Sequence, residues 1–180
     1  VSDRVLEEAL CERMVECVGG MGAQALSNSV WALGKLGHVP SNHLIDKIMI
    51  RIGDVSDHLN AQNIANIFWG FAKLGIVTSE EITEKLSQRA VDEMHSFSPQ
   101  GVTNVLWAHT QLRREPTKAL RTALHTRAVQ CIDKFSAQAV CVTLRSATAR
   151  GAEHDPTLWR ALVSQALKLC TEMTPFGLGV

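Results

Sequence analysis

Hydrophobic and polar positions in this chain repeat at a fixed interval of 38 residues, with no insertion or deletion. A glutamine, an asparagine and a tryptophan mark the repeat. Their members are Gln24, Gln62, Gln100 and Gln138; Asn28, Asn66 and Asn104; and Trp31, Trp69 and Trp107. A period of this length is typical of solenoids, in which each small unit must stack on its neighbours to bury its apolar face.

Within each unit the apolar residues recur at helical spacing in two segments. Leu26, Val30 and Leu33 define one face of the first segment, and Leu44 with Ile48 define an i, i+4 face in the second. No segment alternates hydrophobic and polar residues with period two. The pattern therefore predicts two helices per unit and no strands.

Residues that begin and end helices bound these segments. N-cap residue types stand two positions before each glutamine, at Gly22, Asn60, Ser98 and Ser136, and again at Thr174. The predicted first helix runs for about 14 residues and ends at Gly37, Gly75, Arg113 and Gly151 in the four units. The second helix is expected to follow Pro40-Ser41, Thr78-Ser79, Pro116-Thr117 and Asp155-Pro156.

The sequence thus predicts an all-α fold, an α-solenoid of stacked helical hairpins with a 38-residue repeat. Nine helices and the start of a tenth are expected. Residues 1–21 would hold the second helix of a preceding unit (Asp3 to Cys17), 22–59 unit 1, 60–97 unit 2, 98–135 unit 3, 136–173 a degenerate unit 4, and 174–180 the start of unit 5. We expect these 180 residues to form one continuous array cut from a longer one.

A second face of the first helices carries polar and aromatic residues. At 100° per residue, the Asn, Trp and Lys positions fall within about 40° of the Gln position, opposite the apolar face. The three stripes are Gln24, Asn28, Trp31 and Lys35; Gln62, Asn66, Trp69 and Lys73; and Gln100, Asn104, Trp107 and Gln111. Stacked units would align amides that pair with bases or ribose, indoles that stack on bases, and lysines that meet phosphates. The alternative is structural, with indoles packed between helices and asparagines bonded to the neighbouring backbone.

Residues identical in every unit cannot specify a base sequence. Candidates for specificity therefore vary at the margins of the stripe, although small residues there also suit close helix packing. They are Ala25, Asn63, Gly101 and Ala139 on one side, and Ala32, Gly70, Ala108 and Ser146 on the other.

Basic residues add candidate phosphate contacts. The second helices repeat Arg51, Arg89 and Arg127, which could grip a phosphate or instead bond helix-end carbonyls and acidic neighbours. The third and fourth units add Arg113, Arg114, Arg145 and Arg150. Net charge is zero, but residues 1–97 carry 8 basic and 13 acidic residues, and residues 98–180 carry 10 and 5. A polyanion should therefore prefer the C-terminal half.

The chain contains no catalytic or cofactor-binding motif that we recognise, so we expect no enzyme, no cofactor and no metal site. It has no HExxH, no Gly-rich phosphate loop and no Gly-x-Ser-x-Gly. His109 replaces the apolar Leu33 and Phe71 of the other units and is expected in the core. The five cysteines contain no CxxC pair and are expected to be buried free thiols. No apolar run is long enough to cross a bilayer, so no membrane insertion is expected.

The interval and two segments, residues 60–75 and 98–108, resemble the octatricopeptide repeat family and its Pro-Gln-x-x-x-Asn-x-x-Trp-Ala-x-x-x-Leu pattern. Heptatricopeptide and FAST-kinase-like repeats are similar. The resemblance implies an α-solenoid that binds RNA in mitochondria, or alternatively in plastids. The fourth unit departs from the pattern at Val142, Arg145 and Arg150, which favours phosphate contact over base reading there.

Two functions are expected from these features. The first is an organellar RNA-binding helical-repeat protein that contacts rRNA or mRNA with other proteins of a mitochondrial ribosome or RNA-processing complex. Its candidate RNA-binding residues are Asn28, Lys35, Arg51, Asn66, Lys73, Arg89, Asn104, Arg113, Arg114, Arg127, Arg145 and Arg150. The alternative is a structural scaffold of a large organellar assembly with mainly protein–protein contacts, which the zero net charge favours.

Overall fold

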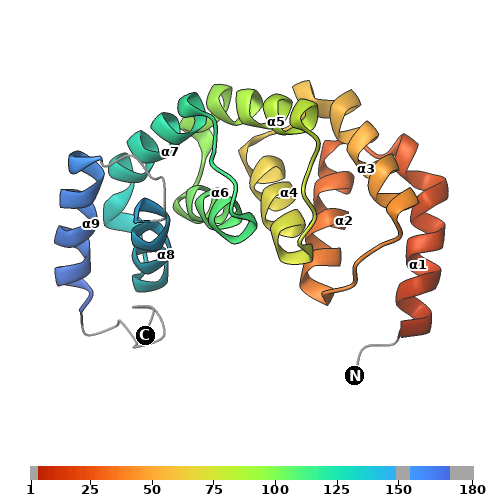
Figure 1. Cartoon of the computed structure of the whole chain (residues 1–180), viewed down its shortest axis with the longest axis horizontal. Helices are drawn as coiled ribbons and strands as arrows, with labels where there is room; N and C mark the ends of the chain where they lie inside the picture. The colour runs from red at the N-terminus through yellow and green to blue at the C-terminus, as the bar shows by residue number, and fades with distance from the viewer. Residues whose placement is uncertain (1–3, 149–154, 171–180) are drawn as a thin grey trace.

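The chain folds into an arch of α-helices arranged in two layers (Figure 1). The computed structural model describes residues 4–148 and 155–170, and in these ranges all regular secondary structure is helical. The inner layer consists of α2 (Ala23–Leu36), α4 (Ala61–Leu74), α6 (Pro99–Leu112) and α8 (Ala137–Ala147). The outer layer consists of α1 (Arg4–Cys17), α3 (Asn42–Val55), α5 (Glu80–Asp92), α7 (Lys118–Gln130) and α9 (Pro156–Lys168).

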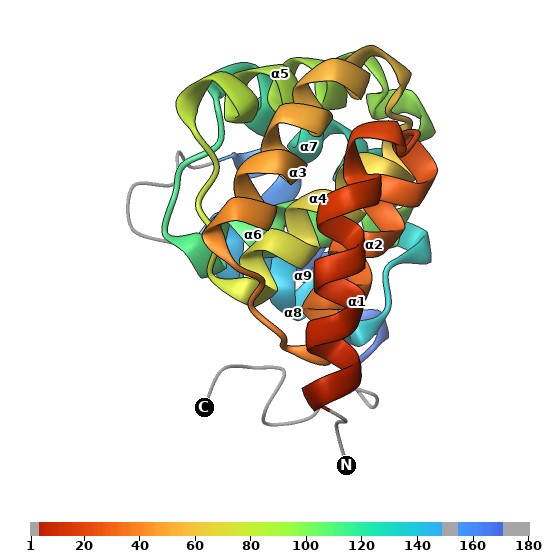
Figure 2. The same cartoon turned by 90° about the vertical axis from the view of Figure 1, so that its right-hand side faces the viewer.

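Each helix packs against the next helix of its own layer. In the inner layer α2 packs on α4, α4 on α6 and α6 on α8, and these contacts are more extensive than those between outer helices. Close inner and wider outer spacing places the inner layer on the concave side of the arch. The view from one end shows successive helical hairpins behind one another (Figure 2). The predicted α-solenoid is therefore confirmed.

The helices begin where the sequence predicts, most of them with a side-chain cap and α2 with Gly22, which makes no side-chain cap bond. Each inner helix starts one residue after its predicted cap, and Asn60 and Asn63 form a reciprocal capping box at the start of α4. In the outer layer, Ser41, Ser79 and Thr117 accept hydrogen bonds from backbone N–H groups three residues on. These bonds satisfy amides that have no partner within a first helical turn.

The C-terminal ends of three inner helices adopt the predicted left-handed conformation. Gly37 and Gly75 both have φ of 69°, and Arg113 has φ of 52° without glycine's freedom. The predicted end of the fourth inner helix at Gly151 is wrong, because α8 already ends at Ala147. Thr148 caps it, and its hydroxyl donates to the carbonyls of Leu144 and Arg145. Asp3, Arg150, Gly151 and residues 174–180 lie outside the described residues.

Short 3-10 turns after the outer helices were not predicted. They are η1 (Val18–Gly20), η2 (Ser56–His58), η3 (Met94–Ser96) and η4 (Ile132–Lys134). The last three lead into Leu59, Phe97 and Phe135, whose side chains are almost completely buried between the layers. The turns therefore place one large apolar residue per unit in the core before the next inner helix starts.

Helices α2 and α4 of the inner layer approach each other closely at two glycines. A methyl group at Gly70 would lie 2.6 Å from the carbonyl oxygen of Val30 and 2.8 Å from its Cγ1, and one at Gly34 would lie 2.9 Å from Gly70 Cα. About two helical turns from this contact, buried Asn63 donates a hydrogen bond of 2.9 Å to Ser27 Oγ across the two units. The spacing of α2 and α4 thus depends on the absence of side chains at these positions.

His109 occupies the core position expected from its alignment with Leu33 and Phe71. It is 7% exposed, and its ring lies 5.3 Å from that of Phe68. Nδ1 lies 3.1 Å from the carbonyl oxygen of Arg114, whereas buried Nε2 has no hydrogen-bond partner among the described residues. Burial lowers the pKa of His109, and the hydrogen bond to the Arg114 carbonyl only partly opposes this effect.

We expect Gly70→Ala to destabilise the fold, because the new methyl group would meet backbone atoms of α2. Such overpacking costs about 1–3 kcal/mol, which exceeds the gain in helix propensity of at most about 1 kcal/mol. Gly53→Ala in α3 is the matched control, since its methyl group would meet only the Ile82 and Lys85 side chains at 3.4 Å or more. Urea unfolding followed by circular dichroism should show a loss for the first variant and none for the second.

We also expect His109 to make stability depend on pH. In the unfolded chain the pKa of the His109 imidazole is about 6.5, and in the folded protein this pKa is lower. The stability that neutral His109 contributes is therefore complete above that pH and is lost as the pH falls toward the folded pKa. The free energy of unfolding should fall more in the native protein than in His109→Leu between about pH 7.5 and 5.5. His95→Gln, at an exposed histidine, should keep the native slope.

Candidate nucleic-acid interface

Three indoles of the inner layer lie side by side along the concave face. The ring centroids of Trp31 and Trp69 are 6.1 Å apart, and those of Trp69 and Trp107 are 6.3 Å apart, with tilts of 35° and 32°. These values lie in the range of about 4.5–7 Å that aromatic pairs prefer. Trp31 is 41% exposed and the other two are half-buried. We call Trp31, Trp69 and Trp107 the indole ladder.

Two exposed lysines cover this ladder. Lys35 Nζ lies 5.7 Å from the centroid of Trp31. Lys73 Nζ lies 5.8 Å from Trp69 and 5.6 Å from Trp107, so that one ammonium group contacts two rings. Each such contact contributes about 0.5–1 kcal/mol at an exposed site. The cation–π contacts hold two positive charges on the surface that the indole rings form.

The amides beside the ladder form a second row. Gln24, Gln62, Gln100 and Gln138 are all exposed. Asn66 Nδ2 donates to Asn28 Oδ1 at 3.4 Å across the unit boundary, and Gln100 donates to Asn104 Oδ1 at 2.8 Å within α6. The sequence left open that these asparagines bond the backbone of the neighbouring unit. In the structure Asn28, Asn66 and Asn104 bond other side chains instead. The exposed amides keep donors and acceptors toward solvent on the same face as the indoles.

The margin positions do not serve as specificity residues where they are buried. Asn63 is 5% exposed and bonded to Ser27, while Gly70, Gly101 and Ala108 are buried between inner helices. A base on the concave face cannot reach them. Burial therefore argues against base specificity at these residues, and close helix packing accounts for the small size of Gly70, Gly101 and Ala108.

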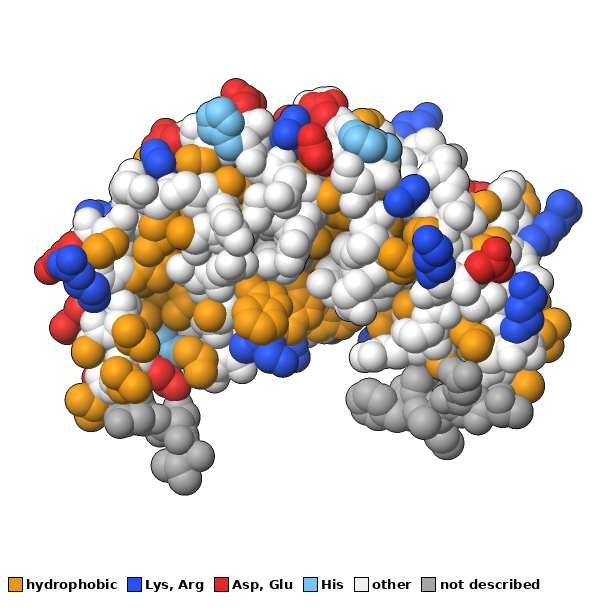
Figure 3. Space-filling model, turned by 180° about the vertical axis from the view of Figure 1, so that it is seen from behind, with side chains coloured by type: hydrophobic (Ala, Val, Ile, Leu, Met, Phe, Trp, Pro, Cys, Tyr) orange, Lys and Arg blue, Asp and Glu red, His pale blue; other side chains and the backbone are white. Residues whose placement is uncertain are grey.

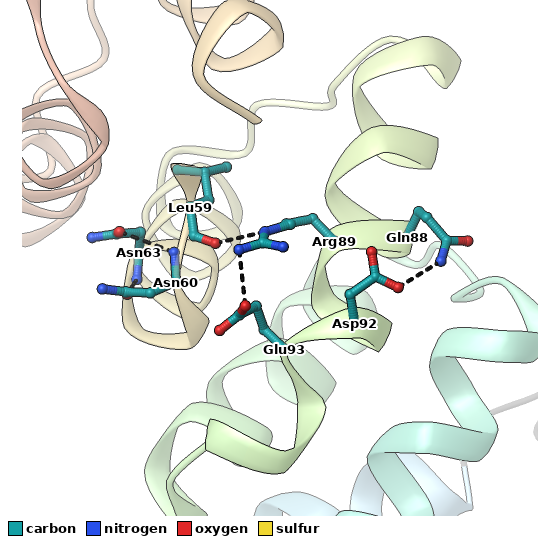
Figure 4. Close-up of polar contacts among 7 residues, drawn as sticks. All are labelled: Leu59, Asn60, Asn63, Gln88, Arg89, Asp92 and Glu93. Atoms are coloured by element: carbon teal, nitrogen blue, oxygen red, sulfur yellow. Dashed lines mark hydrogen bonds and ion pairs between the residues drawn. The ribbon is translucent and has the colours of Figure 1, made fainter. Parts of the chain in front are cut away.

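The repeated arginines of the outer helices bond the backbone next to the preceding 3-10 turn, as Figure 4 shows for Arg89 and Leu59. The Nε atoms of Arg51, Arg89 and Arg127 donate to the carbonyls of Met21, Leu59 and Phe97 at 2.8, 2.8 and 3.0 Å. Arg51 and Arg89 also pair with Asp54 and Glu93. Gln165, at the equivalent position of the fourth unit, donates to the Phe135 carbonyl at 3.2 Å. This is the structural role that the sequence left open, and phosphate contact by these arginines stays a prediction.

The structure brings together only part of the C-terminal arginine group. Arg113 and Arg145 line one hollow together with Trp107, on the concave side. Arg114 lines a different hollow, with Phe68 and His109, and its carbonyl accepts the His109 bond. Seen from behind, the half of the arch that holds α7 to α9 shows more Lys and Arg than Asp and Glu side chains (Figure 3). Thr110, which lines the Trp107 hollow, was missed because its counterparts Gly34 and Ala72 carry no polar group.

The described residues include no group of three or more His, Cys, Asp or Glu side chains placed to hold a metal ion. No helix in the described part is long and apolar enough to cross a membrane. The cysteines are free, but only Cys131 and Cys141 are buried as expected, whereas Cys170 is exposed. Burial raises the pKa of the Cys131 and Cys141 thiols, which keeps them protonated.

Comparison with protein families matches residues 17–175 to the RNA-editing substrate-binding complex 6 protein family. The chain belongs to this family. The match covers all four predicted units and every described helix except most of α1. Comparison with curated proteins gives no match. Membership of the RNA-editing substrate-binding complex 6 protein family supports a helical-repeat protein of RNA metabolism, and membership of the octatricopeptide repeat family itself is not shown.

We expect Arg127 of outer helix α7 to contribute mainly to the free energy of unfolding. Arg127→Ala should lower the free energy of unfolding by about 1–2 kcal/mol, because the Phe97 carbonyl loses its donor. Arg127→Gln should recover part of this loss, since Gln165 makes the equivalent bond in the next unit. Thr126→Ala, at an exposed neighbour, is the control for urea unfolding. Equal stability of the alanine variant and the native chain would contradict this role.

Proposed function

We propose that the chain binds single-stranded RNA along its concave face, as a subunit of a mitochondrial RNA-editing complex. The observation that carries the proposal is the alignment of the indole ladder, two lysines and a row of exposed amides on one continuous surface. The name of the family refers to a complex that binds RNA-editing substrates, which supports RNA as the ligand. The mitochondrial location follows from the resemblance to organellar repeat proteins.

The chemistry of the surface suits a flexible strand better than a duplex. Sequence-tolerant binding of single strands combines positive charge along the backbone with aromatic surfaces for the bases. Here Lys35 and Lys73 supply charge, and the partly exposed indoles supply apolar contact beside amide donors and acceptors. Because the same residues recur in successive units, this part of the surface would hold the strand without reading its sequence.

A scaffold role is the second candidate, and particular observations favour it. Much of the indole surface is used in contacts between units, and the net charge of the chain is zero. A protein that only holds other subunits would need no preference for RNA. The family favours transcript processing over the ribosomal role that the sequence also allowed, so rRNA contact is the weaker form of the proposal. The proposed role is binding, with no catalytic step.

The test is the salt dependence of binding to a fluorescein-labelled single-stranded oligouridylate, measured by fluorescence anisotropy. Each phosphate contact contributes about 0.7 to the slope of log K against log salt for a single strand. Lys35→Gln combined with Lys73→Gln should weaken binding and lower the slope by about 1.4. Lys85→Gln combined with Lys118→Gln removes the same charge from outer helices α5 and α7 and is the matched control.

Two results would contradict the proposal. The native chain could fail to bind the oligouridylate at low salt, which would favour the scaffold role. Alternatively, both double variants could weaken binding equally, which would show a general charge effect without a concave contact surface. Circular dichroism of each variant confirms that the comparison is made between folded proteins.

A further inference from the structure

The indole ladder stops at a defined point, which distinguishes one end of the concave face from the rest. Trp31 is covered by Trp69, and Trp69 by Trp107. The next equivalent position is held by Arg145, and Val142 stands where the first three units have asparagine. Trp107 therefore has no indole neighbour on the side of α8.

A hollow of about 220 Å³ opens at this point. It is lined by Trp107, Thr110, Gln111, Arg113, Val142 and Arg145. The first four come from α6 and its C-terminal cap, and the last two come from α8. We call this hollow the Trp107 pocket. It exists because the fourth unit lacks the indole that would fill the equivalent space between earlier units.

The guanidinium groups of the pocket are available for a ligand. Arg113 and Arg145 are both exposed, and neither makes an ion pair or a cation–π contact with another described residue. This contrasts with the outer-helix arginines, whose Nε atoms bond carbonyl groups. Arg113 is also held in place at its backbone, since its N–H donates to the carbonyl of Thr110 in the cap of α6.

The combination of groups matches one nucleotide of an RNA strand. An indole face accepts a stacked base, and paired guanidinium groups bind the oxygens of a phosphate. The Gln111 amide and the Thr110 hydroxyl add groups that can bond a base edge or a ribose hydroxyl. Sites for free small molecules usually measure about 300–1,000 Å³, so the smaller hollow suits a single residue of a polymer better than a free cofactor.

We propose that the Trp107 pocket binds one nucleotide of the RNA, with the base against the Trp107 indole and the phosphate between Arg113 and Arg145. This proposal rests on the proposed function and gives the strand a fixed anchor. The pocket lies in the C-terminal half, which carries 10 basic against 5 acidic residues. Binding there would fix the position of the strand, while the lysine-covered ladder holds the rest without a preferred register.

The test compares three variants by anisotropy with the labelled oligouridylate. Arg145→Gln should weaken binding about tenfold, as expected for loss of a charge-assisted bond, and should lower the salt slope by about 0.7. Arg145→Trp, which restores the residue of the other units and fills the pocket, should cause a similar loss without loss of thermal stability. Arg160→Gln, at an exposed arginine of outer helix α9, is the matched control and should leave affinity within about twofold of the native value.

Photocrosslinking of an oligouridylate that carries 5-iodouridine supplies a second measurement. Mass spectrometry should locate the crosslink at Trp107 in the native chain, and Arg145→Trp should abolish it there. Native affinity in Arg145→Gln, or a crosslink confined to Trp31 and Trp69, would overturn the pocket while leaving the proposed function intact. Failure of the native chain to bind any RNA would instead overturn the proposed function.

Discussion

The close contact between neighbouring inner helices is the constraint on which the rest of the arch depends. Gly70 brings the backbones of α2 and α4 so near that no side chain fits between them. Among the described residues the outer helices have no equivalent glycine contact and pack less extensively on one another, which curves the array with its inner layer on the concave side. The same approach sets the distance between Trp31 and Trp69, since both project from these two helices. A packing requirement in the core thus determines the geometry of the surface.

A second interaction repeats in every unit and connects it to the one before. An arginine on the outer helix, replaced by Gln165 in the fourth unit, donates to the carbonyl of the residue that directly follows the preceding 3-10 turn. That turn also places Leu59, Phe97 or Phe135 in the core. One polar and one apolar contact therefore fix each hairpin against its neighbour. This bond by itself accounts for the repeated arginine, without any contact to nucleic acid.

Local chemistry made most of the fold predictable from the sequence. Capping at Ser98 or Gly75 depends on residues within a few positions, and the alignment of Trp31 with Trp69 follows from a constant interval and the geometry of a helix. The bond of Arg89 to Leu59 joins residues 30 positions apart. The sequence therefore could not decide whether this arginine binds a carbonyl group or a phosphate, and the three-dimensional arrangement was needed. The hollow beside Trp107 likewise depends on the packing of α8, which has Arg145 in place of the tryptophan of the other units. The end of α8 at Ala147 was not predicted because no glycine follows it there.

The change from Trp107 to Arg145 at the fourth unit makes the concave face asymmetric from one end to the other. Aromatic groups dominate its N-terminal part and guanidinium groups its C-terminal part. An RNA strand also has a direction, because its 5′ and 3′ ends differ in the order of sugar and phosphate. A strand laid along this face in one orientation therefore meets a different sequence of contacts from a strand laid in the other. If the chain binds RNA along this face as proposed, the arch would therefore favour one strand polarity over the other.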